Sequence, residues 1–147
     1  MNLNWLARQV ATGLDFKGDR IEPHEILSYE RLLRAGEVVE PIWNDPSRPT
    51  SDFDWVSRDV RNVELKHGRM DPRTVMNPVL KAALRAATHP WRPMVKDCFL
   101  LDFGEEPITA EVRAAIRGHN KGRRKYRVSR LWVMHNDGEI EELDLEP

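Results

Sequence analysis

The chain has 147 residues, with 23 Lys and Arg against 24 Asp and Glu, 40% apolar residues and a single cysteine. This length and apolar content predict one globular domain, and a disulfide scaffold is excluded because Cys98 has no partner within the chain. No apolar run reaches the roughly 20 residues of a membrane-spanning helix, and residues 1–15 lack the apolar core of a signal peptide, so we expect a cytoplasmic protein without a membrane partner.

The first part of the chain predicts two helices followed by a short strand. Apolar side chains recur at the spacing of one helical face over residues 1–18, which indicates an N-terminal amphipathic helix. A second helix is expected over residues 25–34, because Pro23 precedes it and Gly36 suits a position just past a helix end. Residues 38–43 have the composition of a short strand, and the proline-containing segment after them has that of a loop.

The middle of the chain predicts a hairpin, a helix and a buried strand. Apolar and polar residues alternate over residues 52–56 and 60–66, which indicates two strands joined as a hairpin. A helix is expected over residues 78–88, with Asn77 as its N-cap. The nearly continuous apolar run at residues 98–103 is typical of a strand that is covered on both faces, so we place it at the centre of the sheet.

The last part of the chain predicts a short helix and a C-terminal hairpin. Thr109 is a good N-cap for a helix that ends at Gly118. Residues 126–147 predict a β-hairpin around an Asn-Asp-Gly turn. Its register stays open, because a shift by one residue exchanges which of Trp132 and Val133 faces the core. The complete order of elements predicts an α+β fold: a single domain with a small mixed sheet, three to four flanking helices and a C-terminal β-hairpin.

The hairpin in the middle of the chain is expected to carry a polar face with three acids and a lysine. If its turn centres near Arg58, Asp52 lies opposite Glu64, and strand alternation puts Asp54 and Lys66 on the same face. Facing carboxylates repel unless a cation lies between them, and Mg²⁺ is a hard cation that binds carboxylate oxygens. We therefore predict Asp52 and Glu64 as metal ligands. With Lys66 holding or polarising the attacking water, the three would catalyse phosphodiester hydrolysis.

The same residues resemble a known metal-binding signature. Ser51-Asp52-Phe53 followed by Val63-Glu64-Leu65-Lys66 is similar to the PD-(D/E)xK signature of the restriction-endonuclease-like nucleases, with Ser51 in the place of its proline. The resemblance implies a Mg²⁺ site and a core ordered helix, three strands, helix, strand. The elements expected between residues 25 and 103 follow that order. Glu30 would take the place where some of these nucleases carry an extra acid on the first helix.

The polar face of the hairpin also has an explanation without a metal, and the sequence shows no motif for a structural metal. An ordinary solvated hairpin face, with Lys66 neutralising its acidic neighbours, is the alternative to a metal site. The five histidines show no short paired spacing, and one cysteine cannot complete a zinc motif. We therefore expect no structural metal.

A second feature is the basic segment from Arg117 to Arg130, which contains seven Lys or Arg residues and no acid. Cations on a glycine-containing loop can hold phosphates, and a tyrosine can stack on a base. We predict nucleic acid or another anionic partner here, and the residues expected to bind it are Arg117, Lys121, Arg123, Arg124, Lys125 and Tyr126. The competing explanation is that Arg130 pairs with Asp144 or Glu146 of the acidic strand downstream.

Two classes of function follow from these features. The first is a nucleic-acid-associated protein, at its sharpest a Mg²⁺-dependent nuclease that uses Asp52, Glu64 and Lys66, assisted by Glu30 or Asp54. The second is a non-catalytic protein-interaction or assembly protein, such as an inhibitor or a small virion component, that docks through its charged C-terminal region. A catalytic acidic face is expected to lie in a concave site beside the basic segment, whereas an interaction protein can place the two on unrelated surfaces.

Overall fold

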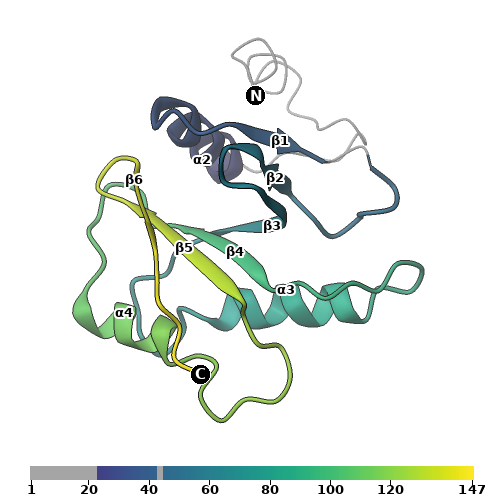
Figure 1. Cartoon of the computed structure of the whole chain (residues 1–147). Helices are drawn as coiled ribbons and strands as arrows, with labels where there is room; N and C mark the ends of the chain where they lie inside the picture. Colours follow the sequence, from purple (N-terminus) through teal and green to yellow (C-terminus); the bar gives the residue numbers. More distant parts are fainter. Residues whose placement is uncertain (1–22, 43–44) are drawn as a thin grey trace.

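The computed structural model describes residues 23–42 and 45–147, and the helix expected over residues 1–18 lies outside this part. Within the described residues there are three α-helices, one short 3₁₀ helix and six strands (Figure 1). In chain order they are α2 (Pro23–Arg34), β1 (Val39–Pro41), β2 (Phe53–Trp55), η1 (Val56–Arg58), β3 (Val60–His67), α3 (Asn77–Ala87), β4 (Cys98–Asp102), α4 (Ala110–Arg117), β5 (Arg130–His135) and β6 (Glu139–Glu142). The expectation of one domain with a small mixed sheet is confirmed.

All six strands join a single sheet in the order of the chain, β1-β2-β3-β4-β5-β6. Strands β1, β2 and β3 form an antiparallel meander, whereas β4 runs parallel to both β3 and β5. Each parallel pair needs a crossover connection, and α3 and α4 provide the two crossovers. Strand β6 returns antiparallel along β5, so the expected C-terminal hairpin is present.

Strand β4 is the buried centre of the sheet, as its apolar sequence predicts. Phe99, Leu100 and Leu101 have no exposed surface. Leu100 packs in the core layer under α2, and its two neighbours pack in the layer under α3 and α4. The strand therefore contributes to both layers, which explains why its sequence does not alternate between apolar and polar residues.

The core layer on the α2 side contains an aromatic cluster that crosses the sheet. The rings of Trp55 on β2 and Trp132 on β5 have centroids 5.2 Å apart, although β3 and β4 lie between these strands. Three strand spacings of a flat sheet amount to roughly 14 Å. The sheet must therefore curl toward α2, with both indoles reaching inward.

The helices begin and end where local chemistry requires, with one correction to the sequence analysis. Gly36 follows α2 with φ of +78°, and the amide of Glu37 donates to the carbonyl of Leu32, which closes the helix end. Thr109 caps α4 as expected, since its hydroxyl accepts a hydrogen bond from the amide of Val112. Asn77 does not cap α3: it is already its first residue, and Met76 precedes it without a side-chain cap. Each helix in the described part falls short of the length and apolarity that crossing a bilayer demands.

The hairpin of β2 and β3 has the predicted strands, together with a bulge. Phe53 pairs with Val63, which brings Asp52 opposite Glu64, whereas Trp55 pairs with Val60. Between these two pairs β3 advances by three residues and β2 by two, so β3 has one extra residue. Asn62 lies in this stretch of β3 and takes a positive φ of 59°. Such a bulge increases the local twist of the strand pair.

The C-terminal hairpin starts later than its sequence predicts, and its register is now defined. Strand β5 begins at Arg130 and not at residue 126, because Tyr126 takes a positive φ of 58°, which a strand does not allow. Trp132 pairs with Glu142. The choice between Trp132 and Val133 is not exclusive: both are fully buried, because β5 has a core layer on each face.

Candidate functional site

Asp52, which immediately precedes β2, lies opposite Glu64 of β3 at the edge of the core. The amide of Leu65 donates to Asp52 Oδ2 at 2.8 Å, and the amide of Asp52 donates to the carbonyl of Val63 at 3.3 Å. Glu64 is buried, with 8% of its surface exposed. Burial and the adjacent Glu64 raise the pKa of Asp52 well above its ordinary value, and the backbone hydrogen bond from Leu65 opposes the shift only in part. The two carboxyl groups therefore repel, as the sequence analysis expects for facing acids.

Two lysines share the carboxylate of Glu64. The ammonium of Lys66 lies 3.3 Å from Glu64 Oε1, and the ammonium of Lys96 lies 3.7 Å from Oε2. The side chain of Lys96 is completely buried, and its ammonium also donates to Ser51 Oγ at 2.8 Å. Burial lowers the pKa of Lys96, while the charges of Glu64 and Asp52 act in the opposite direction. The acidic cluster, defined here as Asp52, Glu64, Lys66 and Lys96, thus carries two acids and two bases.

Sequence reasoning did not identify Lys96. It lies directly before the buried strand β4, where a single cation has no characteristic spacing to any acid. The contact depends on the parallel pairing of β3 with β4, which places Glu64 opposite Phe99. A signal did exist in the sequence: residues 72–96 contain five Lys or Arg and no acid.

The two assisting acids suggested by the sequence lie elsewhere. Asp54 is held by Arg48 through two guanidinium hydrogen bonds and also accepts from the amide of Asn62. Although burial opposes it, the pairing with Arg48 lowers the pKa of Asp54. Glu30 forms an ion pair with Arg34 on the outer side of α2. The acid of α2 whose charge reaches Asp52 is Glu25, one of the causes of the raised pKa of Asp52.

A cationic groove adjoins the acidic cluster along β3 and α3. This cavity of about 260 Å³ is lined by Lys66, Arg69, Asn77, Pro78, Lys81, Ala82 and Arg85. Lys66 belongs to both the groove and the acidic cluster. Lys81 and Arg85 are one helical turn apart, and both are exposed. The groove therefore presents four positive charges beside two carboxylates, which suits an anionic ligand whose reacting group reaches the acids.

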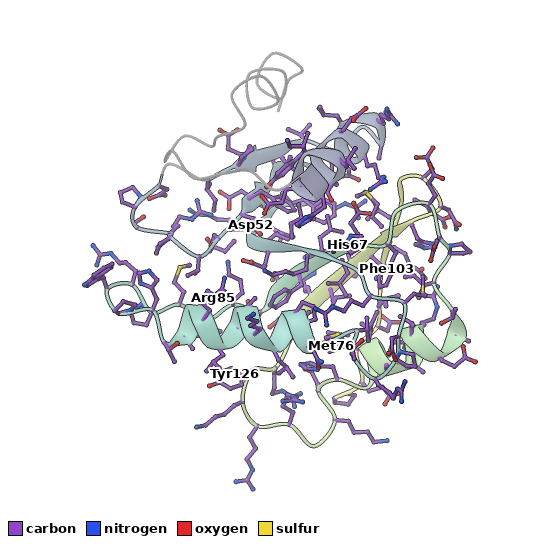
Figure 2. All side chains as sticks on the ribbon, turned by 180° about the vertical axis from the view of Figure 1, so that it is seen from behind. Asp52, His67, Met76, Arg85, Phe103 and Tyr126 are labelled. Atoms are coloured by element: carbon purple, nitrogen blue, oxygen red, sulfur yellow. The ribbon has the colours of Figure 1, made fainter. Side chains whose placement is uncertain are left out.

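The basic segment at residues 117–130 does not lie beside the acidic cluster. Figure 2 shows Asp52 on one side of α3 and Tyr126 on the other. Asn120 holds the loop in place through two hydrogen bonds with the backbone of Val128, at 2.7 and 2.8 Å. The loop forms a shallow hollow of its own, lined by Lys121, Gly122, Arg123, Arg124, Lys125 and Tyr126. The expectation that the basic segment lies beside the acidic cluster is thus wrong. The cationic surface that adjoins the cluster is the groove along β3 and α3.

The basic segment does pair with the acidic strand, but Arg130 binds a different carboxylate from the two that the sequence indicates. Arg130 forms a two-pronged pair with Glu142, at 2.7 and 2.9 Å, and not with Asp144 or Glu146. Arg130 reaches Glu142 because its guanidinium lies over the ring of Trp132, 4.6 Å from the centroid, and Trp132 is the residue that pairs with Glu142. Arg117 donates to the backbone carbonyl of Asp144 at 2.9 Å.

The donors of the acidic cluster suit a hydrated Mg²⁺ ion. Within residues 23–42 and 45–147 there is no group of three or more His, Cys, Asp or Glu side chains arranged to hold a metal. Mg²⁺, however, retains several of its waters and commonly binds proteins through one or two carboxylates. Asp52 and Glu64 provide two, and the repulsion that raises the pKa of Asp52 is what a cation would relieve.

No known relative guides the assignment of a function. Neither a family model nor a curated protein nor a solved structure matches this chain. The function must therefore be argued from the acidic cluster and the groove beside it.

Proposed function

We propose that this protein is a Mg²⁺-dependent nuclease that hydrolyses phosphodiester bonds at the acidic cluster. The observation that carries the proposal is the pair of repelling carboxylates, Asp52 and Glu64, with the ammonium of Lys66 only 3.3 Å from Glu64. Two adjacent acids and a cation are the groups that metal-assisted phosphoryl transfer requires. A purely structural ion pair does not need a second acid that is forced toward its neutral form.

The order of the elements also supports the proposal. The chain runs α2, β1, β2, β3, α3, β4, which is helix, three strands, helix, strand. This is the order implied by the resemblance to the restriction-endonuclease-like nucleases. Asp52 immediately precedes β2, and Glu64 and Lys66 lie on β3, which are the positions that the signature of those nucleases implies for its acids and lysine.

The residues of the chain divide the work in the proposed reaction. Bound Mg²⁺ would supply Lewis acidity and lower the pKa of a coordinated water. Asp52 and Glu64 would hold the cation, and its positive charge would favour the ionised form of Asp52 against the burial and the Glu64 charge that raise the pKa of this carboxyl. Lys66 orients the attacking water or stabilises the negative charge that develops on the phosphate. Lys96, fully buried, keeps Glu64 in place, and the groove cations hold the flanking phosphates.

A cleavage assay tests the proposal directly. Labelled single-stranded, duplex and branched DNA, and single-stranded RNA, are incubated with the protein in Mg²⁺, Mn²⁺ or EDTA. We expect metal-dependent cleavage of at least one substrate and a loss of 100-fold or more in Glu64→Gln and Lys66→Ala, in line with the roughly 10²–10³-fold cost of removing one transition-state-stabilising group. Glu30→Gln, which changes an acid of α2 that is paired with Arg34, is the matched control and should retain activity.

A non-catalytic interaction protein is the competing proposal. Two observations favour it. The basic segment does not lie beside the acidic cluster (Figure 2), as is expected of an interaction protein. Glu64 already has two ammonium partners, so the cluster is balanced without a metal. The charged C-terminal region offers less for docking than its sequence indicates, since Glu141 and Glu142 pair with Arg113 and Arg130. Absence of cleavage in every metal and substrate, or equal cleavage by wild type and Glu64→Gln, would favour this alternative.

A further inference from the structure

The loop between α3 and β4 carries the most exposed large apolar side chains of the described residues. It projects beyond the end of α3 (Figure 1). Trp91 is 80% exposed and Val95 is 83% exposed. Tryptophan normally buries most of its large surface, so an indole held in solvent is an unusual observation.

Hydrogen bonds fix this loop at both ends. The amides of Trp91 and Arg92 both donate to His89 Nδ1, at 3.3 and 3.0 Å, and the imidazole ring packs edge-on to the indole. The amide of Met94 donates to the carbonyl of Ala86 at the end of α3, at 2.9 Å. Pro90 and Pro93 restrict the backbone further. The indole is therefore presented by a defined turn and is not the tip of an unstructured loop.

The loop is part of an acid-free stretch of the chain. Residues 72–96 contain Arg73, Lys81, Arg85, Arg92 and Lys96 without a single Asp or Glu. Lys81 and Arg85 line the cationic groove, and Arg92 is adjacent to Trp91 and exposed. An aromatic face next to exposed cations matches single-stranded nucleic acid, in which bases stack on aromatic rings while cations follow the backbone.

The position of Trp91 relative to the acidic cluster is limited by the chain. Lys96, whose ammonium lies 3.7 Å from Glu64, is five positions along the chain from Trp91. Five residues span at most about 18 Å. This length corresponds to about five base steps at the 3.4 Å rise of each strand in a duplex. A base stacked on Trp91 would thus belong to the same short stretch of strand that reaches the acids.

We propose that Trp91, together with Lys81, Arg85 and Arg92, forms a binding track for nucleic acid with unpaired bases, in which the indole stacks on one base and the cations hold backbone phosphates. The role of the track, which is to lead the strand to Asp52 and Glu64, rests on the proposed function. A base within a duplex has both faces covered by its neighbours, so the indole selects a single strand, an overhang or a branch point. Tryptophan and arginine are common at protein interfaces as well, but a run of cations without a single acid over residues 72–96 matches the uniform negative charge of a nucleic-acid backbone.

Binding without cleavage tests the track. Fluorescence anisotropy is measured in EDTA with a labelled 12-nucleotide single strand and with a blunt 12-base-pair duplex. Trp91→Ala should weaken binding of the single strand by about 5- to 150-fold, the range for loss of one base stack. Trp91→Phe should retain most of the affinity, and Val56→Ala, which truncates an exposed apolar side chain on η1, should not change it. Lys81→Ala with Arg85→Ala should reduce the salt dependence by about 1.4 logarithmic units per decade, at about 0.7 for each phosphate contact.

An abasic scan locates the stack. One base of the single strand is removed at successive positions, and wild type should lose affinity at one position that no longer matters in Trp91→Ala. Equal binding by wild type and Trp91→Ala, equal losses for strand and duplex, or no sensitive position would overturn the inference. A concentration-dependent dimer in sedimentation that Trp91→Ala abolishes would also overturn it and assign the indole to a second copy of the chain.

The two proposals fail in different ways. Cleavage in Mg²⁺ that depends on Glu64, with binding that is indifferent to Trp91, would retain the nuclease and remove the track. Stacking on Trp91 with no cleavage in any metal would remove the nuclease, and with it the stated purpose of the track, while the binding site itself would stand.

Discussion

Replacing Lys96 by methionine should destabilise the fold by about 3 kcal/mol. Removing one partner of a buried ion pair costs roughly 3–5 kcal/mol, because the other charge is left in a poorly solvated place. This range of energies applies because the side chain of Lys96 is fully buried. The lower end applies, since Lys66 remains 3.3 Å from Glu64 and is itself 29% exposed to water. Methionine retains the apolar stem, so little packing is lost.

A double-mutant cycle isolates the electrostatic part of this effect. Once Glu64→Gln has removed the negative charge, Lys96→Met should cost about 1 kcal/mol or less, because the lost hydrogen bond to Ser51 Oγ is offset by removal of a buried cation that has no carboxylate partner on Glu64. The free energy of unfolding is measured by urea titration, with tryptophan fluorescence and far-ultraviolet circular dichroism as the two probes. Lys66→Met serves as the control and should cost less than about 1 kcal/mol, as expected for a partly solvated pair. Equal costs of Lys96→Met in both backgrounds would refute the reasoning.

Two further predictions follow from the same region. The pKa of Asp52 is raised above its ordinary value of about 3.8, so the carboxyl contributes most to stability below that pH, and its contribution is lost as the pH rises through the raised pKa. Because the side chain of Asp52→Asn does not titrate, the free energy of unfolding of this variant should increase relative to wild type as the pH rises from about 4 to about 8. The measurement is urea titration in EDTA at several pH values, and a difference between the two proteins that does not change with pH would contradict this reasoning. Gly68→Ala should cost about 1–3 kcal/mol in thermal unfolding, because a Cβ there would lie 2.5 Å from Phe103 Cδ1. The cost should fall in a Phe103→Leu background, and an unchanged cost would show that the ring is not the obstacle.

The elements that depend on local chemistry could be predicted from the sequence. Strand β4 has an uninterrupted apolar run, and α4 has a threonine cap followed by apolar residues at helical spacing. Both were expected at nearly their observed positions. The start of β5 was not, because Tyr126 takes a positive φ of 58° in a loop that is held by Asn120 and by Asp97, which lies 32 positions before Ser129. Contacts of that separation leave no periodic trace in the sequence.

The candidate site shows the same division. The facing of Asp52 and Glu64 follows from strand alternation within one hairpin, and the observed register agrees with it. The role of Lys96 follows from the pairing of two strands that are joined through a helix, which a spacing rule does not capture. The Arg48 pair that separates Asp54 from the cluster likewise depends on the course of the loop before β2. The sequence therefore indicated two acids and a lysine and missed the buried base that holds them.

The tryptophan pair under α2 gives the protein an internal optical reporter. Two indoles with centroids 5.2 Å apart are close enough for their excited states to couple, and Arg58 and Arg130 cover them at 4.7 and 4.6 Å. Because Trp55 and Trp132 come from strands on opposite sides of the sheet centre, the coupled circular dichroism signal exists only while the sheet stays curled. Among the described residues, the ring contact of the exposed Trp91 is with His89 and not with another indole, so this side chain reports on its own surroundings. One molecule thus contains separate spectroscopic signals for the integrity of its sheet and for events at its projecting loop.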